Sequence, residues 1–465
     1  MKRFLGLFVV LVMVMGFVSS AHAQAYGTAF TTAVTYQNVG SSSANVEVMF
    51  YGSADTTTPI TINRPQLAPG ASTSMHVGQI DDVSTGFRGS AVMQSDQPLL
   101  ATMVQLPQGA TPGTRNRPLS NGFSGGTDTV LIATVLKNAF QTNTIFSVQN
   151  IGNEAATLTF KFYNTSAQKV HEFTQVVQPG AAHYVDAAQI AGLGASFNGS
   201  AVIESTGNIV GGAMELSTNG SGASAFEGVG AGARTVYMPS ALCEAYGANT
   251  AYAVQNTSLT ASTQVTVTYS NGVRATATIG AGAKQSFVAC TATGMPTGFS
   301  GSAIIESSST DIIAIGKAYG SGLSTAFVGA SAGASEIALP YVRWASDTNW
   351  ANGSQQRVYL TIQNIGTENL PAGAVTVSYI DKNGDVLGTP HTLGAIPAGG
   401  KLNSNASNAG LTEFGVYPDG SFGGGALVTG PDGSQLAVVA RVSTQVSPGV
   451  FASEDYSGMP VLSEP

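Results

Sequence analysis

Few residues of this sequence have the types and the spacing that catalysis requires. After the first 23 residues the histidines are His76, His171, His183 and His391, and no two of them have the spacing of a zinc-ligand pair. No Gly-x-Ser-x-Gly elbow appears with a plausible order of Asp and His. The glycine-rich run 228–233 is not flanked by a strand and a helix, as a nucleotide-binding loop would be. We therefore expect no catalytic residue, no cofactor and no enzymatic activity.

One acidic segment is a candidate for a metal site. Residues 381–385 have oxygen-bearing side chains at alternate positions, as at the start of a calcium loop, but no Glu stands at the twelfth position. The equivalent stretches elsewhere in the chain read as plain hairpin turns. The segment predicts a turn and no metal site, with calcium as the alternative.

The chain contains two cysteines, Cys243 and Cys290. An even pair within one domain of an exported protein predicts a disulfide, and neither a Cys-x-x-Cys motif nor a nearby His indicates a metal or redox role. Closing a loop of this size stabilises a fold by about 3–4 kcal/mol in the chain-entropy model.

The elements that carry these residues belong to a fourfold repeat. An apolar run that ends in Gln-Asn occurs four times, and its Asn residues are 112, 106 and 108 positions apart. A Pro-Gly-Ala-like turn follows each copy, and then a Gly-Ser-Ala marker. A period near 110 matches one small domain per repeat rather than a solenoid unit. The Gln-Asn copies are the segments 33–40, 145–152, 251–258 and 359–366.

Each repeat reads as a series of β-strands. Short runs rich in Val, Ile, Thr, Phe and Tyr alternate with turn residues every 8–12 positions, which is typical of a sandwich. We predict an all-β fold of four tandem immunoglobulin-like β-sandwich domains with a C-terminal donor-strand tail. The predicted boundaries are 24–122, 123–227, 228–328 and 329–445 for the four sandwiches and 446–465 for the tail.

The first residues predict export. Residues 1–23 contain Lys2 and Arg3, an apolar run and a final Ala-His-Ala, which is the pattern of a signal peptide. Its removal leaves 16 basic and 26 acidic residues (18 − 2 against 26), a net charge of −10. This balance disfavours a nucleic-acid partner, and no later apolar run is long enough to span a membrane. We expect a secreted, extracellular protein at the cell surface.

The two ends of the chain differ from the repeat pattern in complementary ways. In the second and third repeats a first strand begins 20 residues before the marker Asn, and the same offset from Asn38 falls on Val18, inside the signal peptide. The first sandwich should therefore lack its first strand, while the tail 450–465 has the pattern of a spare one. Strand addition would join them through main-chain hydrogen bonds. The predicted donor strand is Met459, Pro460, Val461 and Leu462, and the predicted acceptor-domain strand contains Val34, Tyr36, Gln37 and Asn38.

Two geometries satisfy this expectation. In one, the tail completes the first sandwich of a neighbouring subunit, and a head-to-tail homo-polymer results. In the other, the tail returns to its own first sandwich and closes a ring. We expect the polymer, because short small-residue linkers between tandem sandwiches favour extended chains. The tail could also be a disordered end.

The pattern also resembles a known kind of protein. The segments Asn121–Gly126, Val130–Asn138, Ser147–Gly152 and Asn198–Ser205 are similar to the repeats of tandem-repeat secreted β-sandwich proteins of filamentous Chloroflexota-type bacteria. The resemblance covers essentially the whole chain after the signal peptide and implies secreted β-sandwich repeats. This sequence departs from the pattern at Ala133, where proline would stand.

Two functions follow from the sequence. The first is a structural subunit of an extracellular filament or sheath, joined by donor strands. The alternative is a monomeric secreted adhesin or carbohydrate-binding surface protein whose partners include surface glycans, with the tail closing on its own first domain. Exposed aromatic clusters would favour the adhesin, and Trp344 and Trp350 are the candidates. They could equally form a patch between domains.

Overall fold

A computed structural model describes residues 29–461 except 53, 84–85, 109–115, 221, 321–322, 352–354, 418–420 and 448–449. The predicted signal peptide and Leu462 of the predicted donor strand lie outside the described residues. The chain is all-β, with strands paired in several antiparallel sheets. Among the described residues, no helix is long and apolar enough to cross a bilayer.

The first two repeats contain the following elements. The first has β1 (Phe30–Asn38), β2 (Ala44–Tyr51), β3 (Ile60–Leu67), β4 (Ser72–His76), η1 (Val77–Gln79), β5 (Ser90–Ser95), β6 (Leu99–Pro107) and β7 (Leu119–Asn121). The second has β8 (Thr127–Lys137), β9 (Thr142–Asn150), β10 (Ala156–Asn164), β11 (Lys169–Val177), β12 (Ala182–Asp186), η2 (Ala187–Gln189), η3 (Ala191–Leu193), β13 (Phe197–Ser217) and β14 (Ala223–Glu227).

The last two repeats follow the same order. The third has β15 (Thr235–Cys243), β16 (Asn249–Asn256), β17 (Thr263–Tyr269), β18 (Arg274–Ile279), β19 (Lys284–Val288), η4 (Ala289–Thr291), β20 (Phe299–Ser307), β21 (Ile312–Gly320) and β22 (Leu323–Val328). The fourth has β23 (Glu336–Leu339), α1 (Asp347–Ala351), β24 (Arg357–Asn364), β25 (Thr376–Asp381), β26 (Val386–Thr392), β27 (Lys401–Ser404), η5 (Ala406–Ala409), β28 (Gly424–Thr429), β29 (Leu436–Ser447), β30 (Val450–Ser457) and β31 (Met459–Pro460).

Each repeat contains two sheets that pack face to face. The Gln-Asn sheet contains the Gln-Asn strand, in the orders β4-β1-β6-β7, β12-β9-β13-β14, β19-β16-β21-β22 and β27-β24-β29-β30. The Gly-Ser-Ala sheet contains the other marker, in the orders β3-β2-β5, β11-β10-β13-β8, β18-β17-β20-β15 and β26-β25-β28-β23. In the second repeat the long strand β13 passes through both sheets and joins them.

Alternation of side chains along the strands builds the cores. On β2, Val46, Val48 and Phe50 are buried, while the residues between them face outward. Burying such a side chain contributes about 1.5–3 kcal/mol, so each repeat gains a two-sheet core from this pattern. Hairpin glycines end the strands, as at Gly272, whose φ of 85° requires glycine between β17 and β18.

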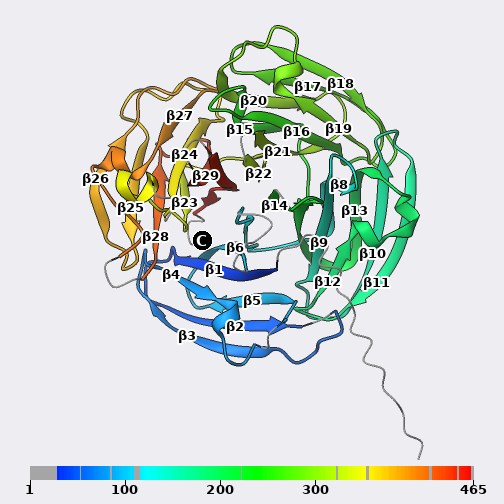
Figure 1. Cartoon of the computed structure of the whole chain (residues 1–465), viewed down its shortest axis with the longest axis horizontal. Coiled ribbons are helices and arrows are strands. Elements are labelled where there is room, and N and C mark those ends of the chain that lie inside the picture. The colour runs from blue at the N-terminus through cyan, green and yellow to red at the C-terminus, as the bar shows by residue number, and fades with distance from the viewer. Residues whose placement is uncertain are drawn as a thin grey trace, which may run out of the picture.

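The four repeats form a ring. Figure 1 shows them in chain order around a common centre, with the first repeat beside the fourth. The cores are continuous between neighbours: Ile313 and Ile315 of the third repeat lie in the core of the second, and Val439 of the fourth lies in the core of the third. The extended arrangement that the short linkers favour is not the one that the structure adopts.

The tail lies in the fourth repeat. β30 pairs with β29 in an antiparallel hairpin, and β31 pairs with β23. Tyr456 is fully buried, and its hydroxyl donates to the carbonyl of Tyr341 at 2.6 Å. A partner strand that is adjacent in sequence costs less loop-closure entropy than a distant one, which explains why these residues add to their own sheet.

Candidate functional site

The Asn of each Gln-Asn pair ends its strand and fixes the loop that follows. The side-chain amide of Asn150 donates to the carbonyls of Glu154 at 2.7 Å and Val177 at 3.0 Å, and its oxygen accepts from the Gly152 amide at 2.9 Å. Asn38, Asn256 and Asn364 make the corresponding hydrogen bonds. The recurring Asn is therefore a structural residue that acts through its side chain.

The Gln of each pair lies at a seam, by which we mean the contact between two neighbouring repeats. Gln149 donates to the carbonyl of Gly180 in its own turn at 2.8 Å and to Ala91 of the preceding repeat at 3.4 Å. Gln255 in the same way reaches Gly282 at 3.4 Å and Ala201 at 3.3 Å. The Gln side chain thus connects a turn with the Gly-Ser-Ala marker of the neighbour.

The Ser of the Gly-Ser-Ala marker completes the same seam. The hydroxyl of Ser90 donates to the carbonyl of Gly180 in the second repeat at 2.7 Å. Ser200 donates to Gly282 at 2.7 Å, and Ser302 completes the series by donating to Gly399 at 2.8 Å. The bond from the marker Ser to the turn glycine thus recurs at three seams, whereas the Gln bridge to the neighbour's marker is present at two; at the third, Gln363 donates to Gly399 of its own turn at 3.1 Å.

The turn glycines at the seams are required by conformation and by space. Gly180 has a φ of 76°, and a Cβ built on it would lie 2.2 Å from the ring of Tyr51 in the first repeat. The equivalent glycines also have left-handed backbones, with φ of 73° at Gly70, 69° at Gly282 and 74° at Gly399. A side chain at Gly180 would therefore displace Tyr51, and one at any of the four positions would strain the backbone.

The fourth seam joins the last repeat to the first and closes the ring. Its chemistry differs, because Gly425 stands where the other repeats have the marker Ser. Instead the amide of Gly424 donates to the hydroxyl of Ser72 at 2.7 Å. Val104 and Leu119 of the first repeat are 2% exposed and lie in the core of the fourth. The closing seam is thus apolar as well as hydrogen-bonded.

One strand from each repeat meets at the centre of the ring. We call β7, β14, β22 and β30 the hub strands; β14 and β22 are labelled near the centre of Figure 1. Each lies beside the next, and β30 returns to β7. Asn121 donates its side-chain amide to the carbonyl of Ser457 at 2.7 Å and its backbone amide to the carboxylate of Glu227. The first repeat is therefore bonded to both the second and the fourth.

Buried carboxyl groups line the hub. Glu454 is 3% exposed and accepts from the backbone amide of Arg117. The pKa of Glu454 is raised to about 8, mainly by burial and in smaller part by the charge of neighbouring Asp455, with Arg117 acting in the opposite direction. Asp455 pairs with Arg441 through two hydrogen bonds of 2.8 and 2.7 Å. The Glu454 carboxyl thus favours its protonated form at neutral pH, whereas Asp455 has a cationic partner.

A second polar cluster lies between the second and third repeats. Glu215 forms an ion pair with Lys317 at 2.7 Å and accepts from the hydroxyl of Thr134 at 3.1 Å. Lys284 donates to Thr134 at 3.0 Å, and burial together with the charge of Lys317 lowers the pKa of Lys284 to about 7. These groups satisfy one another's hydrogen bonds across the seam, as buried polar groups must.

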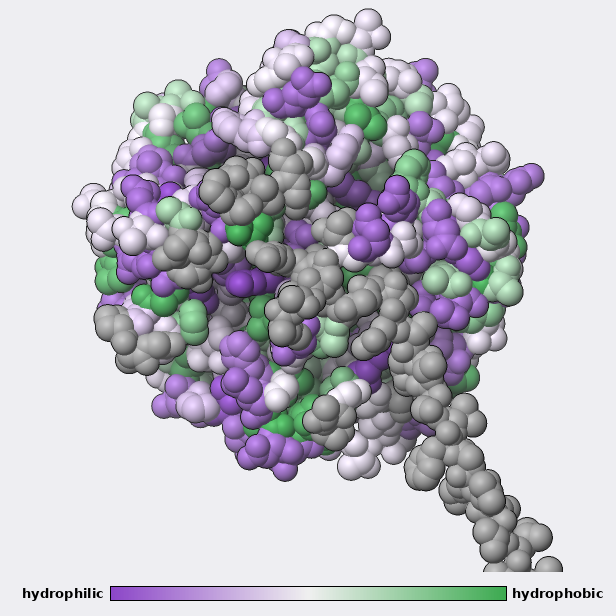
Figure 2. All heavy atoms as spheres, viewed as in Figure 1, coloured by the Kyte–Doolittle hydropathy of each residue, from purple (hydrophilic) through white to green (hydrophobic). Residues whose placement is uncertain are grey.

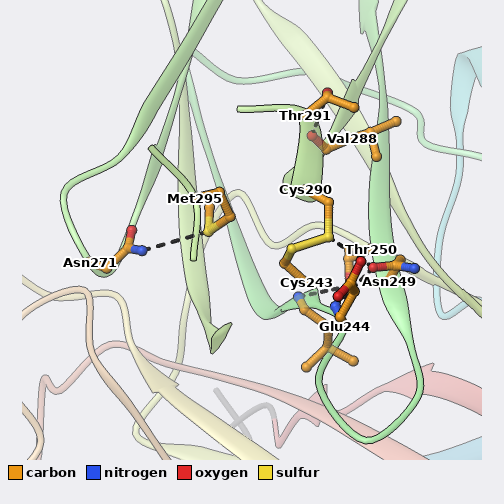
Figure 3. Close-up of a disulfide and its surroundings, with 10 residues drawn as sticks. Cys243, Glu244, Asn249, Thr250, Asn271, Val288, Cys290, Thr291 and Met295 are labelled. Atoms are coloured by element: carbon orange, nitrogen blue, oxygen red, sulfur yellow. Dashed lines mark hydrogen bonds between the residues drawn. A yellow bond between two sulfur atoms is a disulfide. The ribbon is translucent and has the colours of Figure 1, made fainter. Parts of the chain in front are cut away.

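The two cysteines form a disulfide in the third repeat (Figure 3). Cys243 ends β15 and Cys290 lies in η4; the S–S distance is 2.03 Å, and the two cysteines are 47 positions apart in the sequence. Because β15 belongs to the Gly-Ser-Ala sheet and η4 follows a strand of the Gln-Asn sheet, the bond connects the two sheets of one sandwich.

The two tryptophans do not form an exposed binding cluster. Trp344 is 8% exposed and packs against Tyr359, while the ring of Trp350 stacks on Phe451 of β30 with centroids 5.8 Å apart. The guanidinium of Arg357 lies over both indole rings. All of these partners belong to the fourth repeat itself, so the contacts described for the two tryptophans lie within one repeat and not between two.

The predicted donor strand and the predicted acceptor-domain strand do not pair with each other among the described residues. Val34, Tyr36, Gln37 and Asn38 lie on β1, and both edges of this strand are paired, with β4 and with β6. Met459 and Pro460 pair with β23 of the fourth repeat, and Val461 donates to the carbonyl of Glu336 at 3.1 Å. The tail does contact the first repeat, but through the hub strand β7.

The acidic segment 381–385 forms a hairpin turn. The carboxylate of Asp381 accepts from the backbone amides of Asn383 at 2.8 Å and Asp385 at 2.9 Å. Its oxygens are therefore engaged in holding the turn between β25 and β26. In the described part of the chain, no group of three or more His, Cys, Asp or Glu is arranged to hold a metal ion.

Comparisons with known proteins add little to this description. No family model matches the chain, and no curated protein matches it. A solved structure from work on the host cell surface retention of a 1.5-MDa bacterial ice-binding adhesin is 14% identical. The match covers 72% of this chain and 98% of that chain, with a TM-score of 0.12. A score this low establishes no common fold.

Proposed function

We propose that this protein is a secreted, non-enzymatic surface protein that acts as a self-closed monomer of the adhesin type. The observation that carries the proposal is the closing seam. Val104 and Leu119 of the first repeat are buried in the core of the fourth, and Asn121 bonds Ser457, 336 residues away. The first and fourth repeats therefore bury each other's surfaces within one molecule. A head-to-tail polymer would need these same surfaces for contacts between subunits.

Three further features support the extracellular setting. The disulfide between Cys243 and Cys290 persists in oxidising compartments. Charged residues make up only 9% of the chain, and the resemblance to secreted tandem-repeat proteins points the same way. The candidate binding surface is a shallow polar depression on the outward sheet face of the third repeat, lined by Gln264, Thr266 and Arg274. Surface glycans are the ligand class that this polar lining suits.

A filament joined by donor strands is the second candidate. It is favoured by the unpaired edge of β5 within the described residues of the first repeat. However, Met459 and Pro460 would have to leave β23 before they could enter another subunit. This rearrangement makes the polymer the less favourable use of the same tail.

The test is the mass of the secreted protein in solution, followed by glycan binding. Light scattering after size exclusion should give the mass of one chain, and the protein should bind a subset of an immobilised glycan panel. A ladder of polymers that disappears on deletion of residues 450–465 would support the filament instead. A monomer that binds no glycan and no cell surface would contradict the adhesin assignment.

A further inference from the structure

The residues that follow the hub strands can be matched position by position among the four repeats. After each hub strand a glycine donates its amide to the preceding strand of the same sheet. Gly228 donates to Gly211 at 2.7 Å, Gly329 to Ala314 at 2.9 Å, Gly458 to Val438 at 2.8 Å and Gly122 to Ala101 at 2.8 Å. The residues that follow these glycines are therefore equivalent: Phe123, Val229, Ala330 and Met459.

In three repeats this equivalent residue bonds to the first strand of its own repeat. Val229 and Leu131 of β8 exchange two backbone hydrogen bonds of 3.0 and 2.9 Å. Ala330 and Tyr237 of β15 do the same at 2.9 and 2.8 Å, and Met459 pairs with β23. The first strand of each repeat is thus held between the Gly-Ser-Ala strand on one side and the segment after the hub strand on the other.

The first repeat lacks this strand among the described residues. There β5 pairs with β2 alone, and Phe123 is 40% exposed. Ala91 on β5 is exposed, whereas its equivalents Ala201 and Ala426 are fully buried. Within the described residues, no strand lies between β5 and Phe123, and we call this place the slot. Hydrophobic surface is visible over the first repeat in Figure 2.

The three filled repeats show what fits such a slot. Opposite the position of Met93, β8 has Val130, β15 has Val236 and β23 has Ile337, all at most 2% exposed. Opposite the position of Ala91 they have Ile132, Met238 and Leu339, which are all fully buried. The fitting segment is an extended strand with large apolar residues two positions apart.

We propose that the slot between β5 and Phe123 accepts an extended apolar segment of a separate protein as an added β-strand. The tail of this chain is not the occupant, because Met459 and Pro460 already pair with β23. The residues that would occupy the slot by repeat spacing fall within the predicted signal peptide. Unpaired backbone groups give the affinity, and the two apolar positions give the selectivity.

The test uses a synthetic peptide with the sequence of residues 129–137, the first strand of the second repeat, and the secreted protein from residue 24 onward. We expect the labelled peptide to bind in fluorescence anisotropy, and to protect the amides of β5 and Phe123 from hydrogen exchange. Replacing the peptide residues equivalent to Val130 and Ile132 with Asp should weaken binding at least tenfold. A peptide of residues 157–164 should not bind, because β2 fills the equivalent place in the first repeat.

Two protein variants complete the design. Ala91→Arg on β5 should weaken peptide binding at least tenfold, whereas Thr61→Arg on β3, at the opposite edge of the same sheet, should not change it. If Ala91→Arg does not fold, a fusion that adds residues 129–137 before residue 29 replaces it. That fusion should raise the melting temperature and abolish binding.

Three results would overturn the proposal. The first is that no peptide binds and the fusion gives no stabilisation, which would mean that the slot does not accept a strand. The second is that binding appears only after residues 24–28 are deleted, which would mean that the chain fills its own slot. The third is a concentration-dependent dimer that the peptide dissociates, which would make a second copy the occupant.

Discussion

Leu119 connects the first repeat to the core of the fourth, so its truncation should open the ring. The side chain lies on hub strand β7 and is 2% exposed within the fourth repeat's core. Leu119→Ala removes three carbons, worth about 2.4 kcal/mol of transfer free energy, and leaves a cavity that raises the cost to about 2–5 kcal/mol. The matched control is Leu158→Ala, which truncates a leucine that is fully buried in the second repeat.

Both variants should lose similar amounts of unfolding free energy. Only Leu119→Ala should open the seam between the first and fourth repeats. A seam weakened by about 3 kcal/mol should increase the open population by roughly a hundredfold, because each 1.4 kcal/mol is a factor of ten. We therefore expect hydrogen exchange in β30 and β7 to accelerate by that factor in Leu119→Ala. Leu158→Ala should leave exchange in these strands nearly unchanged.

Tryptophan fluorescence supplies a second readout. Trp344 and Trp350 both lie in the fourth repeat, and Trp350 stacks on Phe451 of β30. Urea unfolding followed at these residues should begin earlier in Leu119→Ala than in the control. Equal acceleration of exchange in both variants, or unchanged exchange in β30 of Leu119→Ala, would refute the claim that the first repeat stabilises the fourth.

Three other variants test the buried acid, the disulfide and a seam hydrogen bond. In the folded state the pKa of Glu454 is about 8, so this carboxyl is protonated between about pH 5 and 7. In the unfolded state it is ionised over the same range, and the free energy of unfolding should therefore fall as pH rises. Glu454→Gln, with Arg117 and Asp455 left in place, should reduce the slope of unfolding free energy against pH by about 1.4 kcal/mol per pH unit. An unchanged slope, measured by chemical denaturation, would contradict a buried protonated Glu454. Replacing Cys243 and Cys290 with Ala should cost about 4 kcal/mol for a separation of 47 residues, measured by urea unfolding of the oxidised protein. Ser200→Ala should cost about 1 kcal/mol, because its hydroxyl bonds Gly282 across a seam; no change in the urea midpoint would show that this hydrogen bond does not hold the repeats together.

Much of the strand pattern could be predicted from the sequence, because alternation and turn residues are local signals. Asn38, Asn150, Asn256 and Asn364 each end a strand, as their position before turn residues indicated. What the markers do together could not be predicted. The recurring Gln, the turn glycine and the marker Ser lie far apart in each repeat, and only the packing of neighbouring repeats shows that they meet at one seam.

The closure of the ring depends on the angle between successive repeats, which no local pattern encodes. The tail has the pattern of a first strand, yet it pairs beside β23 rather than replacing a strand of the first repeat. It also contains β30, which is a hub strand like β14 and β22. The common place of these strands at the centre of the ring depends on how the four repeats pack, and no local pattern in the sequence indicates it.

Small-angle scattering of the protein from residue 24 onward tests the closed ring most directly. For the 442 residues after the predicted signal peptide (465 − 23), a compact particle has a radius of gyration of about 22 Å. A string of four domains, each with a radius of about 13 Å, would give roughly 40 Å. A closed ring should give a radius of gyration near the smaller value, about 22 Å, at every protein concentration. A value near the larger one, or one that grows with concentration, would contradict a ring closed by its own first and last repeats.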